Sequence, residues 1–178
     1  MDHSDRQTLI SLVRQRSLAA LGTIFEGGPL VSMVLYASEP DLACLYLHVS
    51  RIAQHTRGLL SHPRVGLMIS EPDRASRNPL TLARVSIQGL AAPLQEGSPL
   101  FENARSLYLA AHPTAAINFD LPDFLLMGVY PESARFIAGF GKIFDLDREA
   151  WARLAAATPG PSTDLPPSDH RRPSRRSD

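Results

Sequence analysis

The side chains best placed for chemistry lie between residues 47 and 57, where an apolar strand pattern ends and a helical pattern begins. At such a junction the free backbone N–H groups and the positive end of the helix dipole face one place, which suits a phosphate group. Ser50 has the side chain of an N-cap or a phosphate ligand, and Gln54, His55 and Arg57 could add donors. From the spacing alone, an ordinary capped helix with a solvated polar face is the favoured interpretation.

Sequence motifs for nucleotide, metal and hydrolase chemistry are otherwise missing. No Gly-x-Gly-x-x-Gly follows a strand pattern, no GxxxxGK[ST] or GxSxG is present, and the six histidines show no His-x-x-x-His spacing. Gly139-Phe140-Gly141 lies between two strand patterns, which favours a bulge or tight bend over a nucleotide loop. The single cysteine, Cys44, has no disulfide partner and no CxxC neighbour. The motifs therefore predict no metal site and identify no catalytic residue.

The elements that must position the 47–57 stretch are short. A helix is expected from Ser4, as its N-cap, to about Arg16, with Leu9, Leu12 and Val13 on the buried stripe. Three apolar runs separated by strong turn signals then predict an antiparallel meander, with strands at 18–25, 30–37 and 43–49.

The second half of the chain alternates strands and helices. A hairpin is expected around Pro131-Glu132-Ser133, and a terminal helix should bury Trp151 and Leu154. The other expected elements are helices at 50–61 and 99–111 and strands at 65–70, 82–94, 124–130, 134–138 and 142–144. Six to eight strands and four helices, joined mostly by tight turns, predict a small antiparallel α+β barrel rather than a βαβ sheet.

Charge and composition divide the chain in two. Its 178 residues hold 18 basic and 18 acidic side chains, and this neutrality argues against nucleic-acid binding. Residues 158–178 contain five of the 15 prolines and are predicted to be a disordered tail, which leaves residues 1–157 as the globular domain. The sequence has no apolar signal region and no run of 18 apolar residues, which predicts a cytoplasmic protein with no membrane partner.

Several stretches together resemble a known family. They look like the FMN-binding split barrel of the pyridoxamine-5′-phosphate-oxidase-like proteins, in order over residues 14–147, and most closely like its haem-utilisation branch. The branch pattern Ser-x-Leu-Ala-x-His-Thr-x-Asn-Leu is met by Ser50, Ala53, His55, Thr56 and Leu59. The other similar stretches are 30–36, 62–67, 83–89, His112-Pro113, Asp123-Phe124 and 134–141.

The resemblance implies an antiparallel split β-barrel with short helices in its connections, which pairs as a homodimer and holds FMN in the groove between the two chains. The favoured function is then an FMN-dependent oxidoreductase acting on an unidentified small molecule through the flavin. A haem-binding or haem-degrading protein is the alternative, and a non-catalytic dimeric barrel is the third. The resemblance implies that Ser32, Met33 and Val34 lie along the flavin ring. The residues implied to surround the phosphate are His48, Val49, Ser50, Gln54, His55 and Arg57. Arg84 is implied to contact the flavin or its phosphate, and an ion pair between subunits is the other interpretation for it.

The chain departs from the oxidases at the phosphate. Ser32 and Ala37 stand where the oxidases place an arginine and a lysine, and 53–55 reads Ala-Gln-His where they have Ser-Arg-Lys. Each lost charged hydrogen bond weakens FMN binding by about 1–3 kcal/mol. The haem branch ligates iron through a histidine of a C-terminal extension, and His170 is the only histidine in the tail of this chain. A proline- and arginine-rich tail supports an axial ligand poorly, because a metal-bound imidazole needs a fixed orientation.

Overall fold

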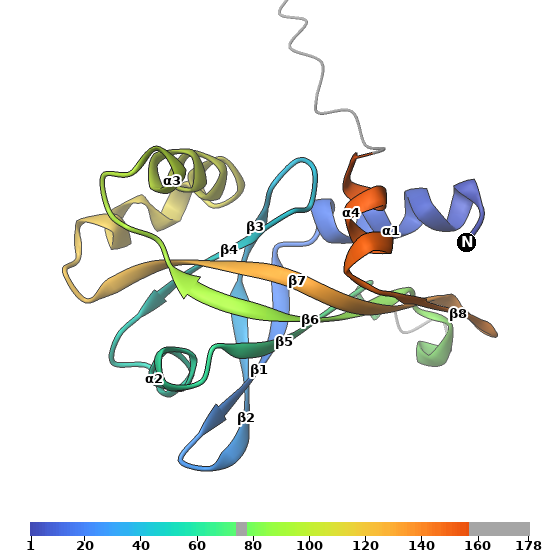
Figure 1. Cartoon of the computed structure of the whole chain (residues 1–178), viewed down its shortest axis with the longest axis horizontal. Coiled ribbons are helices and arrows are strands. Elements are labelled where there is room, and N and C mark those ends of the chain that lie inside the picture. The colour runs from blue at the N-terminus through green and yellow to red at the C-terminus, as the bar shows by residue number, and fades with distance from the viewer. Residues whose placement is uncertain (74–77, 157–178) are drawn as a thin grey trace, which may run out of the picture.

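The computed structural model describes residues 1–73 and 78–156 and shows one curled antiparallel sheet with helices in its connections (Figure 1). The strand order is β2-β1-β5-β6-β7-β4-β3, and β8 pairs with β7. The strands are β1 (Leu18–Phe25), β2 (Gly28–Leu35), β3 (Ala37–Ser38), β4 (Leu45–Ser50), β5 (Arg64–Ser70), β6 (Arg84–Pro93), β7 (Phe124–Gly139) and β8 (Lys142–Leu146). The helices are α1 (His3–Gln15), α2 (Gln54–Ser61), α3 (Pro99–Ala111) and α4 (Arg148–Ala156), with the 3-10 helices η1 (Pro79–Thr81) and η2 (Pro113–Asp120). The predicted α+β barrel is confirmed.

The barrel stays open along one seam. Among the described residues, strand β2 pairs with β1 alone. At the other end of the sheet, β4 pairs with β7 on one side and with the two residues of β3 on the other. The sheet curls enough to bring β2 near β4, although the two strands do not pair. The result is a split barrel, in which the backbone groups on the free edge of β2 remain available.

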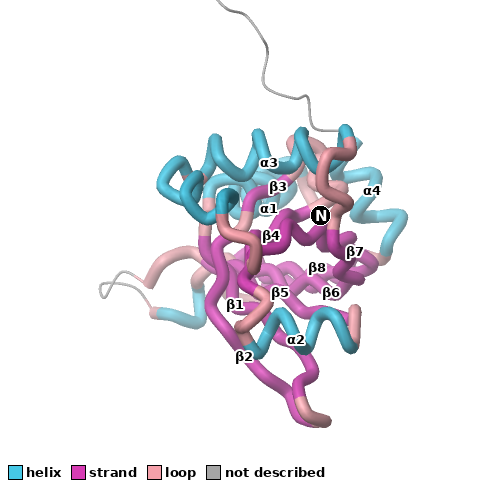
Figure 2. Tube along the Cα trace, turned by 90° about the vertical axis from the view of Figure 1, so that its left-hand side faces the viewer, coloured by secondary structure: helices cyan, strands magenta, loops and turns pink. Residues whose placement is uncertain are grey.

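The main core lies between the inner face of the sheet and helices α1 and α4. Leu9, Leu12 and Val13 of α1 are buried there, as the helical pattern predicts. Trp151 and Leu154 of α4 are buried as well, and the Trp151 indole Nε1–H donates to the Leu42 carbonyl at 3.0 Å. Figure 2 shows α1, α3 and α4 on one side of the molecule and α2 on the other. Helix α2 packs against β1 near the β1–β2 hairpin. Alternate side chains of β2 and β5, such as Val31, Met33 and Met68, are exposed on the other face of the sheet from the main core, and we call this the outer face.

A second, smaller core lies under α3. The helix begins at Ser98, whose side chain accepts from the Phe101 N–H at 3.2 Å, and Pro99 occupies its first turn, where a missing N–H costs nothing. Ala104 and Tyr108 of this helix pack on Tyr46 of β4. Because one core lies on each side of β4, side chains on both faces of this strand are buried.

The predicted hairpin around Pro131 is wrong, because β7 runs unbroken through it. The register shifts between Gln88 and Gly89 because Glu132 of β7 has no partner in β6, and this β-bulge in β7 places Gly89 opposite Pro131. A Cβ on Gly89 would stand 2.3 Å from the Tyr130 carbonyl oxygen, so only glycine allows this approach. The bulge removes the ladder position at which the missing N–H of proline would matter.

The predicted cap of the first helix is wrong by two residues. Asp2, not Ser4, is the N-cap of α1, and its carboxylate accepts from the Asp5 N–H at 2.8 Å. The ammonium of Lys142 lies 2.9 Å from Asp5 and 3.8 Å from Asp2, which fixes the start of α1 to the β7–β8 turn. The Asp2 carboxylate thus accepts a backbone hydrogen bond at the N-terminus of α1, where the helix dipole also favours negative charge.

The predicted tight bend at Gly139-Phe140-Gly141 is confirmed. Gly139 and Gly141 adopt positive φ angles of 142° and 80° between β7 and β8, a conformation that side chains with a Cβ rarely adopt. The predicted tail at 158–178, with His170, lies outside the described residues. Within residues 1–73 and 78–156, no helix combines the length and the apolar character needed to cross a bilayer.

Candidate functional site

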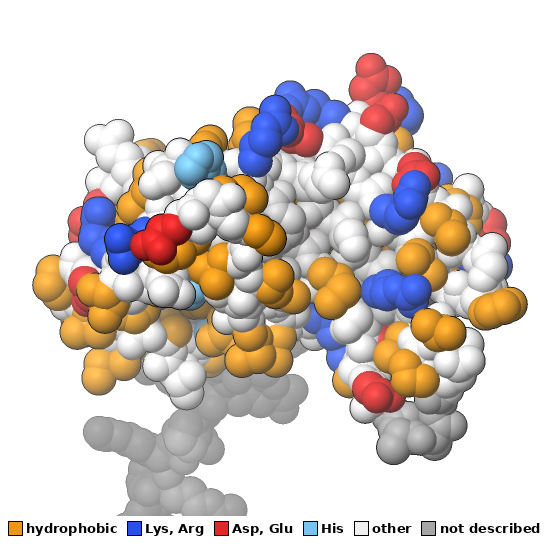
Figure 3. Space-filling model, turned by 90° about the horizontal axis from the view of Figure 1, so that it is seen from below, with side chains coloured by type: hydrophobic (Ala, Val, Ile, Leu, Met, Phe, Trp, Pro, Cys, Tyr) orange, Lys and Arg blue, Asp and Glu red, His pale blue; other side chains and the backbone are white. Residues whose placement is uncertain are grey.

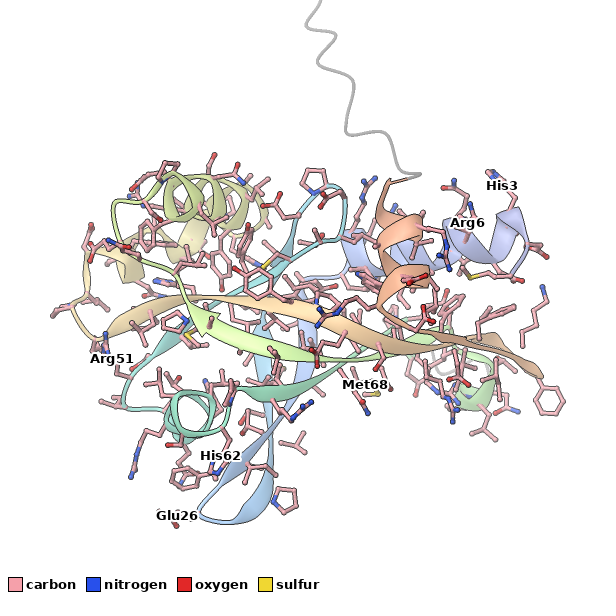
Figure 4. The ribbon with its side chains drawn as sticks, viewed as in Figure 1. His3, Arg6, Glu26, Arg51, His62 and Met68 are labelled. Atoms are coloured by element: carbon pink, nitrogen blue, oxygen red, sulfur yellow. The ribbon has the colours of Figure 1, made fainter. Side chains whose placement is uncertain are left out.

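The outer face carries an open cleft of about 580 Å³ over the β2, β1 and β5 strands. The strand register places Met33 opposite Ala20 and Ala20 opposite Met68, so two thioethers flank one small residue across three strands. Val31 is 70% exposed, Met33 76% and Met68 43%. The cleft falls in the range of roughly 300–1,000 Å³ that is usual for sites of small ligands and cofactors. Figure 4 shows Met68 below the sheet and Arg6 above it on α1, and Figure 3 shows the apolar side chains exposed on the lower side.

One end of the cleft is polar. Arg16, the C-cap of α1, lines it, and the Nε of its guanidinium is buried without a hydrogen-bond partner. Ser70 and the carboxylates of Glu71 and Asp73 also line it, and Glu71 accepts from the Ala83 N–H at 3.2 Å. A buried donor without a partner costs free energy. The Arg16 side chain as a whole is partly exposed and provides a cation with which a ligand carboxylate could pair.

Of the predicted cofactor residues, Ser32 and Met33 line this cleft. The Val34 side chain is 6% exposed and packs in the main core, so it cannot touch a ligand in the cleft, although its backbone lies on the free edge of β2. Arg84 is the register partner of Ser70, but its guanidinium donates to the carbonyls of Leu80 and Leu82 at 3.3 and 3.1 Å. Arg84 therefore stabilises the loop that precedes its own strand.

The remaining predicted residues surround the turn from β4 into α2 and line no part of this cleft. Figure 4 shows Arg51 of that turn and Met68 of the cleft on opposite sides of the β1–β2 hairpin. Ser50 is not the N-cap of α2, because the helix begins at Gln54 with Ala53 as its cap and without a side-chain cap bond. The Ser50 hydroxyl instead donates to the Asp123 carboxylate at 2.7 Å.

His48 faces the second core and not the turn. Its ring stacks on Phe119 with centroids 3.8 Å apart and meets the edge of Tyr108 at 5.7 Å. Burial lowers the pKa of His48 to about 4, and its Nδ1 is buried without a partner. The imidazole is neutral at physiological pH, so it provides no positive charge for a phosphate. Val49 is buried in the main core.

The start of α2 adds little positive charge. Gln54 is exposed, and burial lowers the pKa of His55, which keeps its imidazole neutral. The Arg57 guanidinium lies over the Phe25 ring, 5.1 Å from its centroid, a cation–π contact that holds it on the β1–β2 hairpin.

Sequence reasoning missed most residues of the cleft, among them Arg16 and Met68. Met68 lies between Leu67 and Ile69, both buried, so strict alternation marks it as a large apolar side chain on the solvent face of a strand. Arg16 gives no such signal, because it is one arginine at a predicted helix end among 17 in the chain.

An antiparallel barrel that stays open between two edge strands and carries a cleft on its outer face defines the split-barrel class of proteins. Residues 7–138 match the family described as pyridoxamine 5′-phosphate oxidase. The chain belongs to this family.

Two relatives place the chain in a branch of the family. It is 34% identical over 127 residues to the Arabidopsis thaliana protein named non-canonical heme oxygenase HOZ, chloroplastic, and 23% identical over 135 residues to heme oxygenase HutZ of Vibrio cholerae. The first alignment covers 71% of this chain but 37% of the Arabidopsis protein, so the chain spans little more than a third of that relative's length. The second covers 75% of this chain and 76% of HutZ. The predicted resemblance to the haem-utilisation branch is confirmed.

Solved structures agree on the fold. A heme binding protein from Mycobacterium smegmatis superposes with a TM-score of 0.77 at 27% identity, covering 86% of this chain and 62% of that one. The structure of HutZ, described as a heme storage protein of Vibrio cholerae, superposes with a TM-score of 0.60 at 21% identity over 81% and 90% of the two chains. At that identity the HutZ comparison speaks for the fold alone.

Proposed function

We propose that this protein binds haem in the outer-face cleft, as a haem-binding or haem-degrading protein. The observation that carries the proposal is Arg16, whose guanidinium Nε is buried without a partner at the polar end of an apolar cleft. Haem is a flat apolar ring with carboxylates on one edge, which matches an apolar floor with a cation at one end. The names of HOZ and HutZ favour haem over FMN as the ligand.

The side chains of the cleft fit such a ligand. Val31, Met33 and Met68 would contact the ring, and burying about 100 Å² of their apolar surface is worth about 2.5 kcal/mol. The Arg16 guanidinium would hold a propionate through a charge-assisted hydrogen bond. A bound haem supplies redox-active iron, while the chain supplies binding and orientation.

The acidic side chains give the cleft a direction. Glu71 and Asp73 line it together with Arg16, so a ligand with carboxylates on one edge meets attraction at one place and repulsion at two others. Such a ligand lowers its energy by pointing its carboxylates at Arg16 and away from Glu71 and Asp73. We propose a single orientation of the ring for this reason.

FMN receives less support from the side chains. Ser32 and Ala37 offer no positive charge, and the neutral His48 and His55 offer none at the turn. FMN binding and flavin-dependent oxidoreductase activity therefore stay predictions from the family resemblance, ranked below haem.

We also propose that two copies of the chain pair through the outer face. Leu18, Leu35 and Met68 are exposed there beside Val31 and Met33, and they form an apolar strip that continues to the free edge of β2. Exposed apolar surface of this kind on a sheet face is typical of an interface. Pairing would place the cleft between the two copies and shield a bound ring from water. Light scattering during gel filtration should give twice the mass of one chain.

Titration of hemin into the full chain tests the proposed function. We expect a saturable shift of the Soret band with a dissociation constant in the micromolar range or below. Val31→Glu places a carboxylate on the cleft floor and should weaken hemin binding at least tenfold, since a charge desolvated beside an apolar ring is costly.

Ile117→Glu is the matched control, because Ile117 lies on η2, outside the cleft lining, and is also 70% exposed. It should bind hemin as the unaltered protein does. Absence of a Soret shift in the unaltered protein, or equal weakening in the two variants, would refute haem binding in the cleft.

A further inference from the structure

The turn between β4 and α2 is joined to the loop before β7 by two short hydrogen bonds. The Ser50 hydroxyl donates to Asp123 Oδ2 at 2.7 Å, and the Arg51 N–H donates to the Asp123 carbonyl oxygen at 2.6 Å. Both bonds join segments more than 70 residues apart in the sequence. One residue, Asp123, therefore determines which groups the turn presents.

The backbone N–H groups that precede α2 are already engaged. The Arg51 N–H is bonded to Asp123, the Ile52 N–H donates to Ser50 Oγ at 3.3 Å, and the Ala53 N–H donates to the Ser50 carbonyl at 3.1 Å. A phosphate at this turn would have to compete with each of these bonds. The N–H groups in the first turn of α2 have no partner within the helix. The Asp123 carboxylate, however, is bonded to the Ser50 hydroxyl, which lies just before that turn.

Positive charge around the turn is too sparse to offset that carboxylate. His48 and His55 are neutral, and Arg57 lies over Phe25. The Arg105 guanidinium lies over Phe119, the ring that stacks on His48, and the exposed Arg51 side chain extends from the outer edge of the turn (Figure 4). An exposed arginine is screened by water, whereas the Ser50–Asp123 pair is partly buried and is screened less.

We propose that Asp123 is a specificity-determining residue that keeps phosphate-bearing cofactors such as FMN off the β4–α2 turn. It acts in two ways: its carboxylate repels the phosphate, and it occupies the Ser50 hydroxyl that would otherwise donate to that phosphate. The turn then disfavours FMN through its charge, while the cleft binds haem through its shape and its apolar contacts. Discrimination through a repulsive group is a common route to specificity.

The inference deepens the proposed function and rests on it for the identity of the preferred ligand. A haem has no need of the turn, so Asp123 costs haem binding nothing while it disfavours FMN. The two claims have separate readouts: hemin absorption reports on the cleft, and flavin fluorescence reports on the turn.

Flavin binding by Asp123→Asn tests the inference directly. FMN and riboflavin carry the same ring, and riboflavin lacks the phosphate. Quenching of flavin fluorescence by the full-length protein gives the two affinities. We expect Asp123→Asn to bind FMN about tenfold or more tightly than the unaltered protein does, with riboflavin binding unchanged, because removing one charge a few ångströms from a phosphate is worth that factor.

Two control variants separate charge from hydrogen bonding. Asp120→Asn removes a carboxylate from the exposed end of η2, without contact to Ser50, and should leave FMN affinity unchanged. Ser50→Ala breaks the hydrogen bond but keeps the carboxylate, and FMN binding should stay weak. Thermal unfolding of all three variants reports whether they keep the fold.

Three results would overturn the inference: FMN binding by the unaltered protein as tight as by Asp123→Asn, a gain for riboflavin equal to the gain for FMN, or the same gain in Asp120→Asn. The absence of hemin binding in the same preparation would instead refute the proposed function. The ratio of FMN affinity to riboflavin affinity would still report whether Asp123 excludes the phosphate.

Discussion

The cleft and the β4–α2 turn are both places where this fold can meet a ligand, and they are built in opposite ways. The cleft has volume, exposed apolar side chains and an arginine, Arg16, whose Nε has no hydrogen-bond partner among the described residues. The turn has the residue types of a phosphate site, but its donors are engaged: Ser50 with Asp123, His48 in an aromatic stack, and Arg57 over Phe25. Residue types alone therefore point to the turn, whereas the volume and the exposed apolar surface point to the cleft.

The difference shows how one barrel can change its ligand without changing its fold. The strands that form the split barrel also set the cleft floor, because the register of β2, β1 and β5 aligns Met33, Ala20 and Met68. Occupying the turn with internal hydrogen bonds leaves the sheet untouched. Loops carry function in just this sense, since they alter chemistry on a fixed scaffold.

The largest effect is expected for Arg16→Gln in the cleft. Loss of a charged hydrogen bond to a propionate, worth about 1.5–3 kcal/mol, should weaken hemin binding at least tenfold in a Soret titration. The free energy of unfolding should change little, because the buried Nε of Arg16 has no hydrogen-bond partner within residues 1–73 and 78–156.

Arg84→Gln is the matched control, since that guanidinium is already bonded to the carbonyls of its own loop. It should leave hemin affinity within about twofold of the unaltered protein. Equal losses in the two arginine variants would show that general positive charge, not the cleft, attracts the ligand.

A smaller effect is expected when α2 is pushed off the barrel. A Cβ on Gly58 would stand 2.7 Å from the Ile24 carbonyl oxygen, so Gly58→Ala must displace the helix. Overpacking of this kind costs about 1–3 kcal/mol, and the better helix propensity of alanine returns about 1 kcal/mol of it. Urea unfolding should show a net loss of about 1 kcal/mol while hemin affinity is retained. A parallel loss of hemin affinity would mean that the turn and the cleft form one site.

The smallest effect is a pH dependence from His48. Burial lowers its pKa to about 4, against an ordinary value near 6.5, so the unfolded chain takes up a proton that the folded chain refuses. The contribution of His48 to stability is complete above pH 6.5 and is lost as the pH falls from 6.5 toward 4. Because the ring is only partly buried, the loss should be about 1 kcal/mol.

His48→Phe should reduce that slope in urea unfolding at pH 7 and pH 5. His55 has a lowered pKa as well and contributes a slope of the same sign in both proteins, so the difference between them isolates His48. His62→Gln is the control, since His62 lies exposed at the end of α2 (Figure 4) and should leave the slope unchanged. An unchanged slope in His48→Phe would mean that His48 has the same pKa in the folded and the unfolded chain, which contradicts the burial effect.

Local patterns were enough to predict most of the elements. The stripe of Leu9, Leu12 and Val13 and the burial of Trp151 and Leu154 follow from helical periodicity, and the turn signals mark the β1–β2 hairpin. The predicted meander is wrong at its third strand, because β4 lies at the other end of the sheet and pairs with β7 and β3. Pro131 misled the same reasoning. It ends a strand unless that strand bulges beside it, as β7 does at Glu132, and the close approach of β6 there depends on Gly89, which is distant in the sequence.

The candidate site was less accessible to such reasoning. Ser50 has the side chain of a cap, but its partner Asp123 is 73 residues away, so its role depends on tertiary structure. Met68 and Met33 line the same cleft because the strand register places both beside Ala20. That register can be predicted only once the turns between the strands are known. Ser32 and Met33 were found through the family resemblance, and Arg16 was not found because its significance lies in the lack of a partner.

The central claim is that ligand binds at the cleft and not at the turn, and NMR mapping with a diamagnetic porphyrin tests it most directly. Gallium protoporphyrin would be titrated into ¹⁵N-labelled full-length protein while the amide shifts are followed. The account predicts the largest shifts at Ala20, Met33, Met68 and Ser70, with little change at Ser50, Gln54 and His55. Largest shifts at Ser50, Gln54 and His55, with the cleft amides unmoved, would contradict it.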